Sequence, residues 1–172
     1  MKRNLPPESP FVTDLEEVRG IAQQTLEKIR VQSRLLHPVI LDDFGLEKAL
    51  EWFVEQFGRQ HGIDARFESR GPIGVVPPEA TIHIYRIVQE ALTNVSRHSG
   101  AKDARVRLAQ RDGRLELEIE DHGRGLPQGS DKVDRGIGLV SMRERAELMR
   151  GTFALRPAPG GGLIVSVRVP LG

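Results

Sequence analysis

The stretch of sequence that decides the fold is residues 86–98, "RIVQEALTNVSRH". Its apolar residues recur at three- and four-residue spacing, which predicts a helix with one buried face. Glu90, Asn94 and His98 follow one another at intervals of four residues on a different face, with Arg97 beside them. Because an amide oxygen suits Mg²⁺ and basic side chains suit phosphates, this polar face either binds a charged ligand or is simply solvated.

A glycine turn, "DHGRG" at residues 121–125, follows a predicted strand. The Asp121 carboxylate, at the end of that strand, can accept a hydrogen bond from an exocyclic amine. Gly123 and Gly125 would let the backbone approach a flat base closely. An ordinary Asp-x-Gly turn has the same pattern, so this motif alone leaves both interpretations open.

A second glycine turn, Gly136-Ile-Gly138-Leu139, opens a predicted helix. The first backbone N–H groups and the dipole of a helix form an anion site, although a flexible helix cap would show the same glycines. The three motifs in this order predict a nucleotide site that binds metal and phosphate, then adenine, then phosphate again. Two common classes of nucleotide-binding motif are excluded. The chain has no P-loop motif, and Gln128 and Ser141 stand where the dinucleotide-binding fingerprint requires glycine.

The surrounding pattern predicts an α+β fold, a two-layer α/β sandwich with helices on one face of a mixed, mostly antiparallel sheet. Asp112-Gly113 is a strong hairpin signal between two alternating strands. The loop over 122–136 is longer than a structural connection requires, which is typical of functional loops. The predicted helices cover about 44–60, 77–97 and 138–150, and the predicted strands cover about 63–68, 105–111, 114–120, 152–156 and 163–169.

The N-terminal part of the chain has a different pattern. Residues 1–10 contain three prolines and are expected to be a disordered lead-in. From Phe11 to about Leu36 the apolar spacing predicts a long helix, with a seam either for a partner helix or for its own domain. Pro38 ends that helix, and residues 39–43 form a short connector. The expected organisation is a lead-in over 1–10, a helix with its connector over 11–41, and a globular domain over 42–172.

Composition excludes several classes of protein. The 25 basic and 24 acidic residues give a net charge of +1, so there is no bias toward nucleic acid or membrane lipid. The absence of cysteine excludes disulfides and thiol catalysis. No apolar run reaches the ~18 residues that a membrane-spanning helix needs, and the first residues lack a signal-peptide pattern. We therefore expect a cytosolic globular protein or the cytosolic piece of a larger one.

Together the motifs resemble a known family. "RIVQEALTNVSRH", "DHGRG" and "GIGLVSMRERAELMRG" (136–151) look like the N, G1 and G2 boxes of the ATP-binding domain of sensor histidine kinases, within the gyrase, chaperone and mismatch-repair ATPase superfamily. The run after the second glycine pair resembles the subfamily paired with LuxR-like response regulators. "LLHPVILDDFGLEKAL" (35–50) is similar to that subfamily's link between dimerisation helix and kinase domain. The resemblance covers about Leu15 to Leu171 and implies a Bergerat-type ATP-binding fold.

The resemblance also implies ATP and Mg²⁺ as cofactors and a role for each motif residue. Asn94 would ligate Mg²⁺, and Glu90 would assist by orienting water or the metal. Asp121 would bind the adenine amine, and Gly123 and Gly125 would shape the base pocket. Catalysis would consist of positioning and neutralising the γ-phosphoryl group, with the nucleophile supplied elsewhere.

The second glycine turn would belong to a lid over the triphosphate. Gly136 and Gly138 would hinge this ATP lid, and Leu139 lies in the same nucleotide-binding turn. Arg97 and His98 would lie near the phosphates.

Two features depart from the family pattern. Gly160–Gly162 is followed by Leu163, where the family usually has a threonine hydroxyl. The phosphoacceptor block, a histidine followed by an acid on a first dimerisation helix, is absent. The resemblance therefore implies a kinase part that transfers the γ-phosphoryl group to a histidine that is not in this chain, for relay to a LuxR-like response regulator. The histidines without the acceptor context are His37, His61, His83 and His122.

The missing first dimerisation helix would leave the apolar stripe of Leu15–Leu36 unpaired. We therefore expect a homodimer in the full-length protein and a monomer or weak dimer in this form. Two other functions remain open: a serine kinase of the anti-sigma type, which would not need the long helix, and a non-catalytic interaction module. Leu163 favours the module, whereas the retained Asn94 and Asp121 oppose it.

Overall fold

The structure is a computed structural model that describes residues 39–125 and 136–171. The helix expected over 11–36 and most of the predicted lid loop, residues 126–135, lie outside the described residues. The chain divides into two compact units, Met1–Val39 and Ile40–Gly172, and the whole sheet belongs to the second unit.

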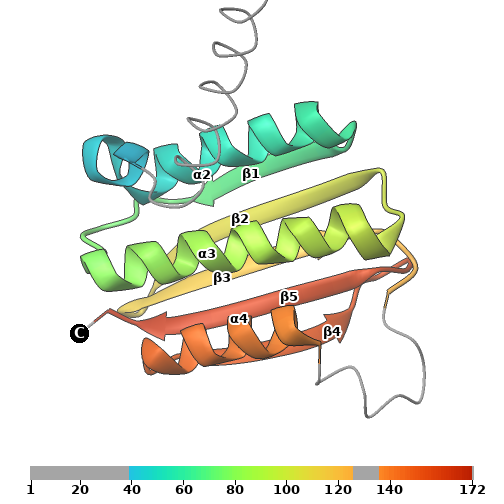
Figure 1. Ribbon diagram of the computed structural model, residues 1–172. Coiled ribbons are helices and arrows are strands. Elements are labelled where there is room, and N and C mark those ends of the chain that lie inside the picture. Colours follow the sequence, from blue (N-terminus) through green and yellow to red (C-terminus); the bar gives the residue numbers. More distant parts are fainter. Residues whose placement is uncertain (1–38, 126–135, 172) are drawn as a thin grey trace, which may run out of the picture. The chain divides into compact units, whose positions relative to one another are not determined.

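A five-stranded sheet forms the back layer of this unit (Figure 1). Its strand order is β1-β2-β3-β5-β4, with β1 and β2 parallel and every other neighbouring pair antiparallel. The mixed, mostly antiparallel sheet expected from the sequence is therefore confirmed. The strands are β1 (Asp64–Arg70), β2 (Asp103–Arg111), β3 (Arg114–Asp121), β4 (Thr152–Pro157) and β5 (Leu163–Pro170).

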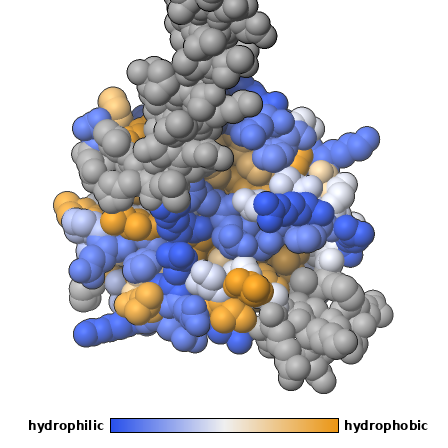
Figure 2. Space-filling model, viewed as in Figure 1, coloured by the Kyte–Doolittle hydropathy of each residue, from blue (hydrophilic) through white to orange (hydrophobic). Residues whose placement is uncertain are grey.

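In the part of the chain that the structure describes, three α-helices cover one face of the sheet. Helix α3 (Pro78–Asn94) crosses its middle, and α4 (Ile137–Leu148) lies over β4 and β5 (Figure 1). Hydrophilic side chains dominate the outer surface of this helical layer, and apolar groups show there only in small patches (Figure 2). None of the helices within residues 39–125 and 136–171 has the length and apolar character needed to cross a membrane. The helices are α2 (Val39–His61), α3 (Pro78–Asn94) and α4 (Ile137–Leu148), and a π-helical turn, η1 (Val95–Ser99), continues α3.

The core lies between the two layers and follows the predicted periodicities. On β3, Leu115, Leu117 and Ile119 are buried against the helices, as the alternation of that strand predicts. The apolar stripe of α3, which includes Ile84 and Val88, is also buried. Burial of these apolar stripes against each other holds the two layers together.

The other face of the sheet carries a ladder of ion pairs. The Arg107 side chain on β2 is only 15% exposed, and its Nη1 lies 2.8 Å from Glu120 Oε2 on β3. Its Nε lies 3.5 Å from Glu68 Oε2 on β1. Glu118 extends the ladder to Arg156 on β4. Charges of alternating sign thus link four strands and keep this face polar, which completes the two-layer arrangement.

Helix α2 differs from the expectation at its start. Residues 39–43, expected as a connector, form a helical turn, and the helix is interrupted at Gly45, which has φ 76° and ψ 177°. That combination is essentially restricted to glycine, because a Cβ would clash with the neighbouring backbone. The chain therefore makes a sharp change of direction where the sequence alone placed a helix start at Phe44.

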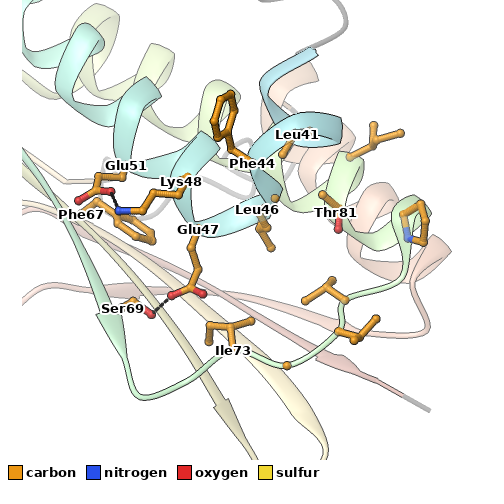
Figure 3. A pocket seen from close by; sticks show the side chains of 16 residues that line it. Leu41, Phe44, Leu46, Glu47, Lys48, Glu51, Phe67, Ser69, Ile73 and Thr81 are labelled. Carbon is orange, nitrogen blue, oxygen red and sulfur yellow. Dashed lines mark hydrogen bonds and ion pairs between the residues drawn. The ribbon is translucent and has the colours of Figure 1, made fainter.

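A cavity of about 730 Å³ lies beside this interruption, between α2, β1 and the start of α3 (Figure 3). Its interior is mainly aliphatic and aromatic, with Leu46 and Phe67 among its walls. The polar groups that line it pair with one another: Ser69 Oγ donates to Glu47 Oε1 at 2.5 Å, and Lys48 Nζ lies 2.7 Å from Glu51 Oε2. These pairs tie the first regular turns of α2 to each other and to β1.

We predict that Gly45→Ala lowers the free energy of unfolding by about 1–3 kcal/mol, the usual cost of forcing a side chain into this backbone region. Chemical denaturation followed by circular dichroism measures the change. Gln60→Ala, on an exposed position of the same helix, should stay within about 0.5 kcal/mol of the wild type. An unchanged midpoint for Gly45→Ala would mean that α2 runs straight through this position.

Candidate nucleotide-binding site

The ends of α3 and β3 and the starts of α4 and β5 lie at one edge of the sheet (Figure 1). Residues from these segments line a pocket of about 610 Å³. It brings together residues from all three sequence motifs, although these are separated along the chain. Seven of the ten predicted site residues line it: Asn94, His98, Asp121, Gly125, Gly136, Gly138 and Leu139. The pocket is therefore the candidate functional site.

Asp121 is the buried acidic residue of this pocket. It is the last residue of β3, is only 5% exposed, and its Oδ1 accepts a hydrogen bond of 2.9 Å from the Gly123 N–H. Burial raises the pKa of the Asp121 carboxyl above its usual value, partly offset by the Gly123 N–H and by His122, while nearby Asp103 raises it further. A carboxylate held this way has lone pairs left to accept a hydrogen bond from a ligand.

The missing threonine hydroxyl does not remove the support of this carboxylate. Leu163 follows the 160–162 turn and pairs with Asp121 across the sheet. Its backbone N–H also donates to the Asp121 side chain and lowers the pKa of that group. The departure from the family pattern therefore changes a side chain while the backbone donor is kept.

The two glycines of "DHGRG" have different surroundings. Gly125 lines the pocket at φ 66°, and a Cβ there would come within 2.9 Å of the Gly162 carbonyl oxygen. Gly123 lies behind the pocket wall, where a Cβ would come within 2.7 Å of the Ser99 Cβ. Both positions exclude a side chain, one because of the turn before β5 and the other because of the turn after α3.

The polar face of α3 approaches the start of α4. A Cβ on Gly138 would overlap the Glu90 carboxylate oxygen and would lie 3.3 Å from Asn94 Nδ2. Glu90 is thus beside the pocket, although it is not among its lining residues. The absence of a side chain at Gly138 lets the carboxylate and the amide meet the first turn of α4.

The end of α3 departs from the expected geometry. The regular helix stops at Asn94, and Val95–Ser99 forms a π-helical turn that ends at Gly100 in the left-handed conformation. His98 lines the pocket, whereas Arg97 is exposed and lies outside its lining residues. The helix predicted to run to about Arg97 is therefore regular only to Asn94, and the wider turn changes the direction of the side chains that follow.

Several lining residues were not singled out from the sequence. Arg124 lies in the middle of "DHGRG", and an apolar wall is formed by Ile119, Met142 and Val165. For two of these residues the sequence pattern predicts a place in the pocket. Ile119 precedes Asp121 by two residues on the same face of β3, and Met142 follows Leu139 by one helical turn. No such pattern predicts Arg124, since it lies in a turn, where residues do not repeat with a regular period.

The start of α4 offers backbone donors to the pocket. Gly136 is its N-cap, in an extended conformation and without a side-chain capping bond. The first N–H groups of a helix have no partner inside the helix, and the dipole there favours negative charge. A chain segment of this kind can hold a phosphate or another anion.

Comparison with known proteins identifies the family. Residues 79–172, more than half of the chain, match the family model described as "Histidine kinase-, DNA gyrase B-, and HSP90-like ATPase". The chain belongs to this ATPase family. The matched part includes the pocket and all ten predicted site residues. The match to an ATPase family implies that this domain binds ATP.

Curated relatives narrow the type of ATPase. The chain is 31% identical over 161 residues to "Oxygen sensor histidine kinase NreB" of Staphylococcus carnosus, covering 94% of this chain and 46% of the relative. It is 28% identical over 158 residues to "Signal transduction histidine-protein kinase/phosphatase DegS" of Brevibacillus brevis, covering 92% and 41%. The ATPase domain is therefore of the histidine kinase type used in two-component signalling, and the chain spans about half the length of these relatives.

A solved structure supports the fold. The ATP-binding domain of PrrB from Mycobacterium tuberculosis superimposes with a TM-score of 0.60 at 22% identity, covering 73% of this chain and 93% of that one. The ATPase domain described here has the histidine kinase fold, as the resemblance of its motifs implied.

The two glycines before α4 allow a matched test of the packing at Glu90. Gly138→Ala would overlap Glu90, whereas a Cβ on Gly136 meets only Leu139 Cδ1 at 4.0 Å. The atom that the new Cβ would meet is the flexible end of the Glu90 side chain, so that carboxylate can turn away at little cost to the fold. Because its contact at the site would be lost, we predict that Gly138→Ala weakens ATP binding by roughly 3- to 10-fold, the usual worth of one hydrogen bond. Gly136→Ala should bind within about twofold of the wild type. Calorimetric titration measures both, and equal losses would indicate that hinge flexibility matters instead of space.

The raised pKa of Asp121 makes a prediction about stability. An acid whose pKa is higher in the folded state lowers the stability of the fold as pH rises from its unfolded value, about 3.9, through its folded value. Without nucleotide, Asp121→Asn should therefore melt at the same or a higher temperature than the wild type at pH 7.5. This difference should shrink as the pH falls toward about 4.

Thermal melts of Asp121→Asn at a series of pH values provide the test. Asp112→Asn, the same chemical change at the exposed tip of the β2–β3 hairpin, is the control. The prediction is contradicted if Asp121→Asn melts below the wild type by an amount that does not change with pH. That result would show that the charge of Asp121 does not oppose folding.

Proposed function

We propose that this chain binds ATP with Mg²⁺ and transfers the γ-phosphoryl group to a histidine that is not in this chain. The observation that carries the proposal is one pocket that holds a buried carboxylate, Asp121, together with the amide of Asn94 and the N-terminus of α4. A nucleoside triphosphate needs an acceptor for its base, oxygen ligands for its metal and donors for its phosphates. The pocket offers all three.

The adenine would bind at Asp121. Its carboxylate accepts backbone N–H groups from Gly123 and Leu163 and retains lone pairs for the exocyclic amine. Ile119 and Met142 line the same pocket and would pack against the flat faces of the purine. Guanine presents a carbonyl oxygen at the corresponding position, so this arrangement favours adenine.

The metal would bind beside Gly138. Mg²⁺ prefers oxygen ligands and is usually held by one or two protein groups together with substrate phosphates and water. The Asn94 amide and the Glu90 carboxylate both lie against Gly138, which fits that requirement. Asn94 would supply a direct ligand, and Glu90 would orient a water or the metal. Bound Mg²⁺ would neutralise negative charge on the phosphates.

The phosphates would bind at the first turn of α4 and at His98. The backbone at Gly136–Leu139 supplies donors, and His98 lines the adjacent wall. Arg97, initially expected near the phosphates, lies outside this set and is left out of the proposal. Catalysis would then consist of holding the γ-phosphoryl group in line with an incoming nucleophile and neutralising its charge.

The described histidines support an acceptor on another segment. His98 lies inside the pocket, and His122 is held by Asp103 at 2.6 Å. His83 lies on α3, where burial and the nearby Arg145 lower the pKa of its imidazole. His61 is at the end of α2 and is not among the lining residues of the pocket. None of these lies on a helix with the phosphoacceptor pattern.

We further propose that residues 11–41 are part of a dimerisation helix with its connector, and that 42–172 form the kinase domain. The phosphoacceptor would come from a first dimerisation helix of a homodimeric full-length protein. The phosphoryl group would then pass to a response regulator of the LuxR-like class. The relatives named as an oxygen sensor histidine kinase and as a signal transduction kinase/phosphatase support a histidine kinase reaction.

A transfer assay in trans tests the proposed reaction. The chain is mixed with radiolabelled MgATP and a separate polypeptide that carries a phosphoacceptor block from a related kinase. We predict label on the acceptor that is stable to alkali and lost in acid, as phosphohistidine is, and no label on the chain itself. Asp121→Asn should reduce the rate at limiting ATP by roughly 10- to 150-fold, because a hydrogen bond to a charged group is worth about 1.5–3 kcal/mol.

Asp112→Asn is the matched control and should transfer at the wild-type rate. Acid-stable label on a serine would support a serine kinase of the anti-sigma type instead. ATP binding by the wild type with no transfer to any acceptor would favour the non-catalytic module.

A further inference from the structure

The turn after α3 and the "DHGRG" turn are joined by Arg124. Its backbone N–H donates to the Ser99 carbonyl oxygen at 2.9 Å, and its side-chain Nε donates to the His98 carbonyl oxygen. Gly123, one residue earlier, lies so close to Ser99 that it has no room for a Cβ. Three consecutive contacts thus fasten one turn to the other.

These bonds fall on groups that the helix itself leaves unsatisfied. The last carbonyl groups of a helix have no partner within it and need one from elsewhere. The carbonyls of His98 and Ser99 are at that position, because η1 ends at Gly100 in the left-handed conformation. Ser99 is held further, since its hydroxyl donates to the Val95 carbonyl oxygen at 2.9 Å and accepts the Ala101 N–H at 2.9 Å.

The position of these bonds matters for the ATP site. The π turn begins directly after Asn94, and both Asn94 and His98 line the pocket. Asp121 lies three residues before Arg124, in the other turn. Arg124 is therefore the side chain that links the wall bearing Asp121 to the wall bearing Asn94. π turns within helices are frequent at functional sites and persist only where neighbouring groups support them.

We propose that Arg124 is a positioning residue for the metal end of the ATP site. It holds the π turn by its bond to the His98 carbonyl, so that Asn94 stays directed at the metal while Asp121 holds the base. The inference rests on the proposed function, because it assigns to Arg124 a role in the Mg²⁺-dependent part of ATP binding. Its guanidinium also lines the pocket, so a direct charge interaction with phosphate is the alternative that the test must separate.

The test is calorimetric titration of ATP in EDTA and in Mg²⁺, on the wild type and on three arginine variants. Arg124→Met keeps the length of the side chain and the backbone N–H but removes the side-chain donor. Arg124→Gln removes the charge but keeps an N–H that can reach a carbonyl. Arg111→Met is the matched control, because Arg111 is an exposed arginine at the end of β2 and lies outside the pocket lining.

A positioning role predicts a specific pattern. In EDTA, Arg124→Met should bind ATP within about twofold of the wild-type affinity. The factor by which Mg²⁺ increases ATP affinity should be roughly 2- to 10-fold smaller in this variant than in the wild type, which is the usual effect of losing one hydrogen bond. Arg124→Gln should recover most of that gain, and Arg111→Met should match the wild type. Arg124→Met should add little to Asn94→Ala in the double variant, because the two act through the same ligand.

Other patterns would overturn the inference. If Arg124 acts by charge, Met and Gln variants should be equally weak and should already lose affinity in EDTA. If it is merely structural, affinity should fall by the same factor with and without Mg²⁺. A wild type that binds ATP with no gain from Mg²⁺ would instead contradict the proposed metal site, which distinguishes failure of the proposed function from failure of this inference.

Discussion

The structure depends on close backbone contact at one edge of the sheet. There the turn after β3 packs against the turn after α3 on one side and against the turn before β5 on the other. Gly123 and Gly162 have no space for a Cβ, and Gly138 has none beside Glu90. Because these segments are far apart in the sequence, the contacts form only when the two layers of the core have assembled. The pocket proposed for ATP is thus a consequence of how the fold closes at this edge.

Asp121 shows the cost of that arrangement. Burial makes its charged form unfavourable, and two backbone N–H groups compensate only in part, so the pKa of the carboxyl stays raised. In the protein without a ligand, a neutral group at this position would destabilise the fold less than the charged carboxylate does. A ligand that donates a hydrogen bond to the carboxylate offsets this cost, and the conflict between stability and binding at one residue is typical of functional sites.

Much of the fold followed from residue patterns. The stripe of Ile84 and Val88 predicted α3, the alternation of Leu115 and Leu117 predicted β3, and Asp112-Gly113 predicted the hairpin between β2 and β3. These signals are local and repeat at the period of the element, so one sequence is enough to find them. Placing Asp121 at a strand end next to a glycine turn likewise needed no knowledge of the sheet order.

What the sequence did not reveal depends on contacts between distant segments. The π turn after Asn94 cannot be distinguished from continued helix by apolar spacing. Gly45 interrupts α2 through a backbone conformation that composition does not report. The role proposed for Arg124 is visible only because its side chain reaches the His98 carbonyl across two turns.

The central claim is that the pocket at this edge is a MgATP site, and calorimetric titration of ATP into the wild-type chain, in EDTA and then in Mg²⁺, tests it most directly. The account predicts one binding site per chain whose affinity is increased by Mg²⁺, and no comparable binding of GTP. Absence of ATP binding in both conditions, or equal affinity for GTP, would contradict it.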